Sequence, residues 1–489
     1  MLRNWVWAVL IVGGAAGVIA MLVLSLFGLA AAIALATGVL GIAFGMAVGW
    51  RFGIRRHVVA LLGPRWMLGA VLRHSVQTAD RPNVQLALDS LQSRSDTPGP
   101  FGIQDSGIDY GDASAERYFA SVMAVVAGNP EPVAIDWLSQ PKSSGETLDC
   151  ACNALYLLRV LDRPVCVLVQ QRTKGASSRA VLQILGRTKP EARAALDEIL
   201  RVSREQSVYR GRVISVQRVE KQEGDMAVQF HDLKDVDRAA IILPPELQET
   251  IDRNVLGFFR HAAALRRAGR GTRHGVLLHG PPGTGKTLVT QYLATTVGVT
   301  VLIVHGRQYA LLRPTCQLAK LLAPSLIVLE DVDLIGADRR NNRHGALLHD
   351  LLDEMDGLGA GSDVVFLLTS NRPEILEPAL ASRPGRVDQA IYFPLPDLDC
   401  RRRLFVRFTN GLDVSGLDLE TMLLRTEGAS PAFLKELFRR AVLLALERGA
   451  TGEPLAVVGD DFERALHELL QAGGTLTRSF LGFPAPTVR

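Results

Sequence analysis

The chain has 489 residues, enough for two to four domains at about 100–200 residues each. Lysine and arginine total 54 against 50 aspartates and glutamates, so the formal net charge is only +4. A balance this even gives no reason to expect a nucleic-acid partner. The cysteines number five and form no CxxC pair, which predicts reduced thiols and excludes a disulfide framework.

The N-terminal region is an uncharged, apolar run from Trp5 to Trp50. One helix needs about 20 residues to cross a hydrocarbon core of about 30 Å, so this run suits two spans joined by a tight turn. Arg3 precedes the run and Arg51 follows it, and positive flanks stay on the cytoplasmic side. We therefore expect residues 1–56 to form a transmembrane helical hairpin in a cell (inner) membrane, with the remaining chain cytoplasmic. The alternative is a buried helical hairpin in a soluble protein.

Residues 57–115 are expected to form a juxtamembrane segment and linker. Their second half is rich in Gly, Ser and Asp and contains Asp96-Thr97-Pro98-Gly99-Pro100. Two interpretations are open for the apolar residues of the first half: contact with the membrane surface, or a plain linker helix. The residues concerned are Val58, Val59, Leu61 and Leu62.

Residues 116–230 are interpreted as a small α/β middle domain without a catalytic constellation. Thr188 and Glu191 have the spacing of a capping box, which predicts that a helix begins just before Ala192. The other expected elements are a helix at 153–160 and strands at 164–169, 180–185 and 212–219.

The strongest motif is Gly-Pro-Pro-Gly-Thr-Gly-Lys-Thr, which follows an apolar strand and precedes a helix. Such glycines let backbone N–H groups surround phosphate oxygens at a helix N-terminus. Lys286 is spaced to reach the β- and γ-phosphates of ATP, and Thr287 to offer its hydroxyl to Mg²⁺. The expected nucleotide-binding residues are Gly280, Pro281, Pro282, Gly283, Thr284, Gly285, Lys286, Thr287 and Leu288.

A partner motif follows the apolar run 325–329, which is typical of a buried strand in a parallel sheet. Glu330, Asp331 and Asp333 come at its end, and the carboxyl ends of parallel strands face the nucleotide crevice. We expect Glu330 to help hold Mg²⁺ and Asp331 to polarise the attacking water.

With both motifs in place, residues 244–462 resemble the ATPase core of the AAA family. The segment 364–371 is similar to the family's strand that ends in the sensor-1 residue, here Asn371. Further matches are the Leu-Leu-Asp-Glu-Met-Asp-Gly helix end at 351–357, the second region of homology at 372–388, and the start of the helical lid at 426–432.

The resemblance implies a P-loop AAA domain, with a parallel sheet flanked by helices at 231–395 and a small helical lid with a C-terminal tail at 396–489. It implies that Arg383 and Arg386 are arginine fingers, which reach the γ-phosphate bound by a neighbouring subunit. One extra residue precedes Arg383, so Arg386 is the better match. The implied partners are further copies of the chain in a ring, a hexamer, and a protein client.

Two departures from the family pattern bear on mechanism. The family usually has Asp-Glu where this chain has Glu330-Asp331, and the order found here is similar to that of the Bcs1-like branch. The interval that carries an aromatic pore loop in threading members is short, at 305–314. Within it, Tyr309 and Leu311 are either remnants of that loop or residues that pack a helix, and packing is the preferred interpretation.

These features together predict a membrane-anchored ATPase that remodels, assembles or translocates protein clients. The alternative is a scaffold or switch at the membrane that binds ATP but hydrolyses it slowly or not at all. The segment beginning at His467-Glu468 lacks the second histidine of HExxH, so no zinc protease is expected. The basic run 260–274 is better explained by a solvated helix than by nucleic-acid binding.

Overall fold

The computed structural model describes residues 53–103, 122–128, 131–171, 180–218, 226–272, 274–333, 351, 353–355, 357, 362–372, 374 and 387–472. The chain divides into two compact units. Unit 1 contains the residues up to Gln140 and Leu148–Gln206, and unit 2 contains Pro141–Thr147, Ser207–Val219 and the residues from Met226 onward. The expected transmembrane hairpin lies outside the described residues. Within the described ranges, no helix is long and apolar enough to cross a membrane.

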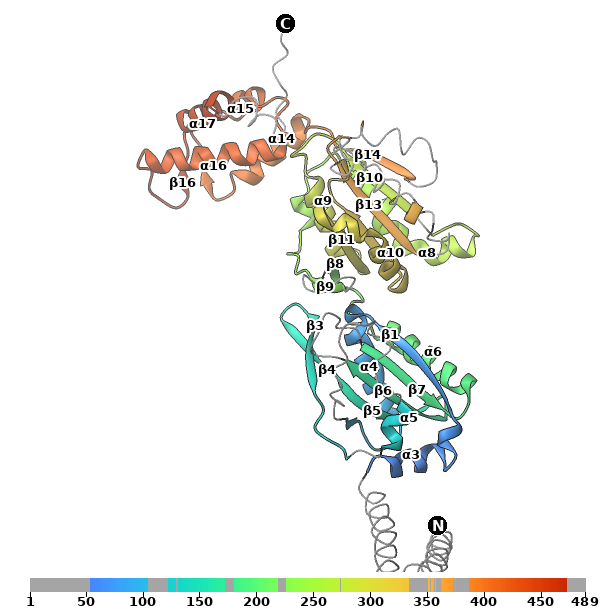
Figure 1. Cartoon of the computed structure of the whole chain (residues 1–489). Helices are drawn as coiled ribbons and strands as arrows, with labels where there is room; N and C mark the ends of the chain where they lie inside the picture. Colours follow the sequence, from blue (N-terminus) through green and yellow to red (C-terminus); the bar gives the residue numbers. More distant parts are fainter. Residues whose placement is uncertain are drawn as a thin grey trace, which may run out of the picture. The chain divides into compact units, whose positions relative to one another are not determined.

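Unit 1 is built on a five-stranded antiparallel sheet (Figure 1). The strands, in spatial order, are β1 (Ala70–Val76), β7 (Ala180–Gly186), β6 (Arg163–Gln171), β5 (Asn153–Val160) and β2 (Phe101–Gly102). β3 (Trp137–Ser143) and β4 (Glu146–Ala151) pair separately in a two-stranded sheet.

Helices cover both faces of this sheet. The helices α4 (Arg81–Arg94) and α6 (Lys189–Glu205) pack on one face, and α3 (Arg55–Leu62) and α5 (Val122–Ala127) pack on the other. Side chains alternate along each strand, so Tyr156 belongs to the first core and Leu157 to the second. Thr188 caps α6 by accepting a hydrogen bond from the Glu191 backbone N–H, as its spacing predicts.

Three expectations for this region are wrong. Residues 153–160 form strand β5, because an all-apolar run has no period and its pairing with β6 decides its conformation. The expected linker supplies α3, β1, α4 and β2 to the fold. Neither open interpretation of the apolar residues of α3 holds, because Val58, Leu61 and Leu62 are buried in the core of unit 1 and Val59 packs against it.

Unit 2 contains a seven-stranded sheet in which every neighbouring pair is parallel except the last. The strands, in spatial order, are β14 (Gln389–Tyr392), β10 (His274–His279), β13 (Val364–Ser370), β12 (Ser325–Leu329), β11 (Thr300–Val304), β8 (Val213–Arg218) and β9 (Met226–Phe230). The sequence predicts that residues up to 230 belong to the middle domain. In the structure, β8 and β9 extend this sheet at the β11 edge.

The helices of this part of unit 2 follow the βαβ pattern of a doubly wound fold (Figure 1). They are α7 (Pro245–Asp252), the π-helical turn η5 (Arg253–Gly257), α8 (Phe258–Arg267), α9 (Lys286–Thr296), η6 (Gly306–Leu311) and α10 (Leu312–Leu321). The largest core side chain on β13 is Phe366, which is fully buried. All five cysteines of the chain are buried and free, as expected of reduced thiols.

The C-terminal part of unit 2 is a helical lid with its own aromatic core. Phe405, Phe433, Phe438 and Phe462 pack together at its centre. Its elements are α14 (Leu398–Phe408), β15 (Leu412–Asp413), α15 (Leu419–Arg425), α16 (Pro431–Glu447), β16 (Leu455–Ala456), α17 (Gly459–His467) and the π-helical turn η7 (Glu468–Ala472).

Candidate nucleotide-binding site

The loop between β10 and α9 has backbone geometry that requires glycine. Gly280 has φ +148°, and a Cβ atom at this position would lie 2.3 Å from the Phe393 carbonyl oxygen. Gly283 and Gly285 also have positive φ, of 76° and 98°. Other residues rarely adopt these conformations, so the glycines allow the chain to turn sharply before α9 begins at Lys286.

Lys286 is a buried cation at the start of α9, only 6% exposed. Its Nζ donates hydrogen bonds to the carbonyl oxygens of Gly280, at 2.9 Å, and Pro281, at 2.8 Å. Burial lowers the pKa of its ammonium to about 8, while the charges of Asp331 and Asp333 act in the opposite direction. The loop therefore holds a partly desolvated cation that gains from an anionic ligand.

The residues after β12 and β13 meet at the same edge of the sheet. The Asp331 N–H donates to Thr369 Oγ1 at 3.0 Å, and the Asn371 side-chain amide donates to Asp331 Oδ1 at 3.1 Å. The Asn371 backbone N–H donates to Asp333 Oδ1 at 3.1 Å. The structure thus brings Asn371 together with Asp331, as adjacent parallel strands are expected to do.

Glu330 lies differently from its neighbour. Asp331, with φ +52°, is exposed and lines the cavity beside Lys286, whereas Glu330 is half-buried and is not one of the described residues that line it. Burial raises the pKa of the Glu330 carboxyl; His305 opposes this shift, and Asp331 adds to it. The division of roles between the two carboxylates stays a prediction.

Tyr309 packs beneath this edge of the sheet. It is 5% exposed, and its hydroxyl donates a hydrogen bond to the Glu330 carbonyl oxygen. Leu311 is likewise buried. Of the two interpretations of these residues, the structure supports packing and not exposure on a pore loop.

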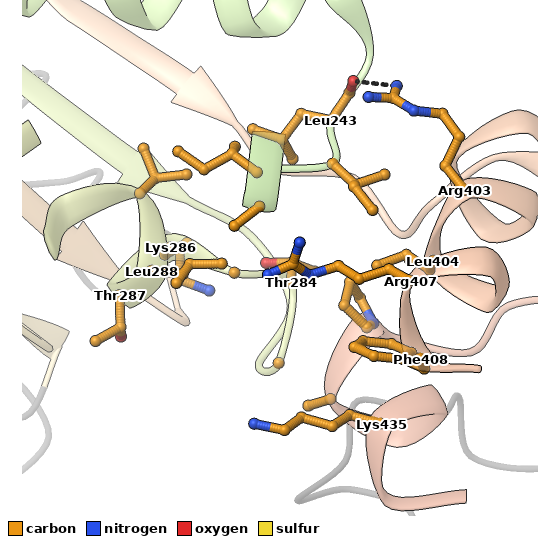
Figure 2. A pocket seen from close by; sticks show the side chains of 18 of the residues that line it. Leu243, Thr284, Lys286, Thr287, Leu288, Arg403, Leu404, Arg407, Phe408 and Lys435 are labelled. Atoms are coloured by element: carbon orange, nitrogen blue, oxygen red, sulfur yellow. Dashed lines mark hydrogen bonds between the residues drawn. The ribbon is translucent and has the colours of Figure 1, made fainter. Parts of the chain in front are cut away.

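Lys286, Asp331 and Asn371 line a cavity of about 1320 Å³ between the sheet and the lid. The P-loop supplies Pro282–Val289, the sheet supplies Asp331, Thr369 and Asn371, and the loop before α7 supplies Ala239–Leu243. Figure 2 shows the lid side of the cavity, which is formed by α14 and α16. Clefts with this mixture of apolar walls and a few charged groups are typical ligand sites.

The lid is joined to the P-loop through backbone atoms. The Ala432 N–H, in the first turn of α16, donates to the Gly283 carbonyl oxygen at 3.2 Å. Ser430 caps the same helix by accepting from the Phe433 N–H. On α14, the Arg403 guanidinium donates to the Leu243 carbonyl oxygen at 3.5 Å (Figure 2). The start of α16 is therefore in direct contact with the P-loop.

Sequence analysis missed two cations of the lid. Arg407 on α14 and Lys435 on α16 line the cavity, and both extend toward the P-loop in Figure 2. Within the described residues, neither forms an ion pair, in contrast to Arg402, which pairs with Glu420 at 2.8 Å. No motif in the sequence marks either residue, and it is the fold of the lid that brings both to the cavity.

Not every expected site residue can be placed. Arg383 and Arg386 lie outside the described residues. Asp388, which follows them, accepts hydrogen bonds at 3.0 Å from His274 Nδ1 and from the Gly275 N–H. The segment that leaves Arg386 is thereby tied to the start of β10.

The donor atoms in the cavity fit Mg²⁺ bound together with phosphate. Of the two predicted metal ligands, Thr287 lines this space and Glu330 does not, so the carboxylate that faces it is Asp331. Mg²⁺ is usually held by one or two oxygen ligands of the protein plus phosphates and water. Among the described residues, no three His, Cys, Asp or Glu side chains are grouped so as to hold a metal on their own.

Comparison with known proteins agrees with this geometry. Residues 276–395 match the model of the family described as ATPase family associated with various cellular activities (AAA). The chain is 34% identical over 305 residues to a proteasome-activating nucleotidase of Pyrococcus horikoshii, covering 58% of this chain and 71% of that protein. It is 36% identical over 241 residues to an ATP-dependent zinc metalloprotease FtsH of Acidimicrobium ferrooxidans, covering 46% and 35%.

A P-loop, polar residues at the ends of adjacent parallel strands and a helical lid define a nucleotide-hydrolysing α/β protein. The extent of the similarity to the nucleotidase identifies which class of these proteins is present. The chain belongs to the AAA family of ATPases.

Proposed function

We propose that this ATPase binds ATP with Mg²⁺ in the cavity and hydrolyses it as a ring homo-oligomer, a hexamer. The cycle remodels, assembles or translocates a protein client at a membrane. The observation that carries this proposal is the convergence of the P-loop, the Asp331–Asn371 pair and the lid on one cavity. The similarity to proteins named for proteasome activation and for ATP-dependent proteolysis supports a protein client.

Each group around the cavity has a chemical task in the proposed reaction. Lys286 exchanges its carbonyl partners for phosphate oxygens. Thr287 and a carboxylate oxygen would hold Mg²⁺, which would supply positive charge to neutralise the phosphates. Asp331 polarises the attacking water, and the amide of Asn371 fixes the orientation of its carboxylate. The Glu330 carboxylate is assigned to the metal side.

In this proposal the lid moves when the nucleotide in the cavity gains or loses phosphate. Arg407 and Lys435 face the cavity without ion-pair partners among the described residues, so added phosphate charge attracts them. The Ala432–Gly283 hydrogen bond links this attraction to the P-loop backbone. A ligand shifts such an equilibrium by its difference in affinity for the two lid positions. Arg383 and Arg386 of a neighbouring subunit would complete the site in the ring.

Membrane attachment is the part of the proposal that depends on sequence alone. The uncharged run from Trp5 to Trp50 is long enough for two spans, and the basic residues on both sides place the ATPase on the cytoplasmic face. We propose a cell (inner) membrane location on this basis.

A slow switch is the second candidate, and one observation favours it. Glu330 is not among the described residues that line the cavity, whereas Asp331 is. Compared with Asp-Glu, the Glu-Asp order lengthens the first side chain by one methylene and shortens the second by one. If the metal-side carboxylate does not reach the site, ATP is held without rapid turnover.

Steady-state ATP hydrolysis by the full-length protein in detergent separates the two candidates. Lys286→Ala serves as the blank, and Lys320→Ala, which removes an exposed lysine on α10, serves as the matched control. The motor predicts turnover in wild type and in Lys320→Ala that is lost in Lys286→Ala. Tight ATP binding with turnover no higher than the blank would establish the switch instead.

A further inference from the structure

We propose that one end of the unit 1 sheet is a contact surface for anionic phospholipid. This strand-end surface consists of residues 65–68, 159–163 and 187–189. The inference rests on the proposed membrane anchoring, and it assigns to unit 1 a role that the ATPase site does not supply.

The register of the sheet brings these three segments together. Ala70, the first residue of β1, pairs with Gly186, the last residue of β7, and Gly186 pairs with Val165 near the start of β6. At the next strand, Val160 pairs with Arg163 across the β5–β6 turn. The segment before β1, the β5–β6 turn and the segment after β7 therefore lie at the same end of the sheet.

Large apolar side chains are exposed at this end. Leu68 is 81% exposed, Met67 is 50% exposed and Leu161 is 60% exposed. The neighbouring Trp66 is 2% exposed, so the short helix η1 (Trp66–Leu68) is fixed in the core while its next two side chains point out. A patch of exposed apolar side chains rimmed by polar residues marks a site of interaction with a protein or a membrane.

The β5–β6 turn is chemically unusual for a simple connection. Its two central residues, Leu161 and Asp162, have φ of 50° and 60°. Two-residue hairpin turns with positive φ at both positions favour Asn-Gly or Asp-Gly, and leucine is costly there. An exposed leucine in a strained conformation contributes nothing to the core, which points to a role for its side chain outside the fold.

The charge of the surface is strongly positive. Its basic side chains are Arg65, Arg159, Arg163, Arg187 and Lys189, all exposed, and its one acidic side chain is Asp162. Apolar side chains surrounded by arginine and lysine suit the boundary between lipid headgroups and acyl chains. Negative surface potential attracts each such cation.

The position of the strand-end surface in the chain indicates that it contacts a lipid bilayer. The Arg187 guanidinium donates hydrogen bonds to the carbonyl oxygens of Leu62, at 3.1 Å, and Leu61, at 3.4 Å, and so holds the C-terminal end of α3. Helix α3 begins at Arg55, five residues after the apolar run ends at Trp50, and it spans only about 12 Å. If the run is in a bilayer, the strand-end surface is within reach of that bilayer.

Fluorophore depth measurements on the full-length protein in vesicles test this inference. Because the native cysteines are buried, Leu68→Cys and Leu161→Cys can each be labelled with an environment-sensitive dye. The vesicles contain phosphatidylcholine with or without phosphatidylglycerol, and a lipid with a nitroxide on its acyl chain is the quencher. Leu424→Cys on α15, where the native side chain is 74% exposed, is the control.

We expect blue-shifted emission and quenching at positions 68 and 161 in anionic vesicles, and neither at position 424. The quenching also gives the ratio of docked to undocked protein. Arg163→Gln should lower this ratio about fivefold, as expected for loss of one cation at a membrane surface. Lys142→Gln on the exposed β3–β4 hairpin should leave it unchanged. Unquenched dyes at 68 and 161 would overturn the inference. This includes blue-shifted but unquenched dyes, which would mean that a partner protein and not lipid covers the surface. Equal quenching in neutral vesicles would overturn the role of charge.

The same preparation keeps this inference separate from the proposed function. Vesicle flotation after alkaline extraction reports anchoring, and ATP turnover reports the motor. A protein that floats and hydrolyses ATP while both dyes stay in water retains the proposed function and loses the strand-end surface. A protein that does not float contradicts the anchoring on which the surface depends.

Discussion

The sheets of unit 1 and unit 2 each contain a fully buried strand, and the sheet of unit 2 also positions polar residues around the cavity described above. β7 in unit 1 and β13 in unit 2 are each buried at every position. In the antiparallel sheet, successive strand ends alternate between opposite edges. In the parallel sheet, the carboxyl ends of β10, β12 and β13 lie at one edge, so Lys286, Asp331 and Asn371 meet there. Strand direction, more than burial, decides where chemistry can be assembled.

The largest effect is expected from neutralising the carboxylates that follow β12. Asp331→Asn should lower the turnover number by about 100-fold or more and leave ATP binding intact, because a positioned general base contributes at least this much. Hydrolysis and filter binding of ATP are the measurements. Glu330→Gln is the matched variant and should weaken the response to Mg²⁺. If Glu330→Gln alone trapped ATP, the two roles would have to be exchanged.

Equivalent core deletions in the two sheets sharpen the comparison. Leu158→Ala in β5 and Leu367→Ala in β13 each remove a fully buried leucine, and each should destabilise its own unit by about 2–5 kcal/mol. Thermal unfolding with and without ATP is the measurement. ATP should raise the transition of unit 2 in wild type and in Leu158→Ala. Equal ATP stabilisation of both units would contradict the assignment of the site to unit 2 alone.

The pH dependence of ATP binding follows from Lys286. Its pKa is lowered to about 8 in the folded protein, so the ammonium loses its proton as the pH rises above that value. Phosphate favours the charged form, and ATP affinity should therefore fall by up to about tenfold per pH unit above pH 8. Calorimetry from pH 7 to 9.5 measures this, with adenosine, which has no phosphate, as the control ligand.

The same titration of Lys286 should affect stability in the opposite way. Without nucleotide, the free energy of unfolding should rise over the pH range in which ATP affinity falls. Between pH 8 and the ordinary lysine pKa of 10.5, the unfolded chain binds a proton that folded Lys286 does not. The contribution of Lys286 to the free energy of unfolding therefore rises with pH over this window. A rise that persisted in Lys286→Ala would have another origin.

The smallest effects are expected on the lid. Lys435→Ala and Arg407→Ala each remove a cation that faces the P-loop, and each should weaken ATP binding by about fivefold, in line with one solvent-screened charge interaction. Arg439→Ala on the same helix α16 is the control, because that arginine pairs with Glu436. Salt should reduce the effect of Lys435→Ala. An unchanged dissociation constant in both variants would remove the lid cations from the site.

The sequence by itself determined the nucleotide site, because a P-loop works through local backbone geometry. Glycine spacing, the strand before it and the helix after it are encoded within a short stretch, and the structure reproduces them at β10 and α9. The capping of α6 by Thr188 is equally local. The AAA resemblance added Asn371 as a site residue, and the structure shows its hydrogen bond to Asp331.

Only the tertiary structure decided the conformation of β5, the edge position of β8 and β9, and the meeting of the lid cations with the P-loop. An apolar run such as 153–160 has no period that distinguishes strand from helix, and its partner β6 settles the matter through hydrogen bonds. β8 joins unit 2 by pairing in parallel with β11. Lys435 and the P-loop are far apart in the chain, and folding of the lid places them around one cavity.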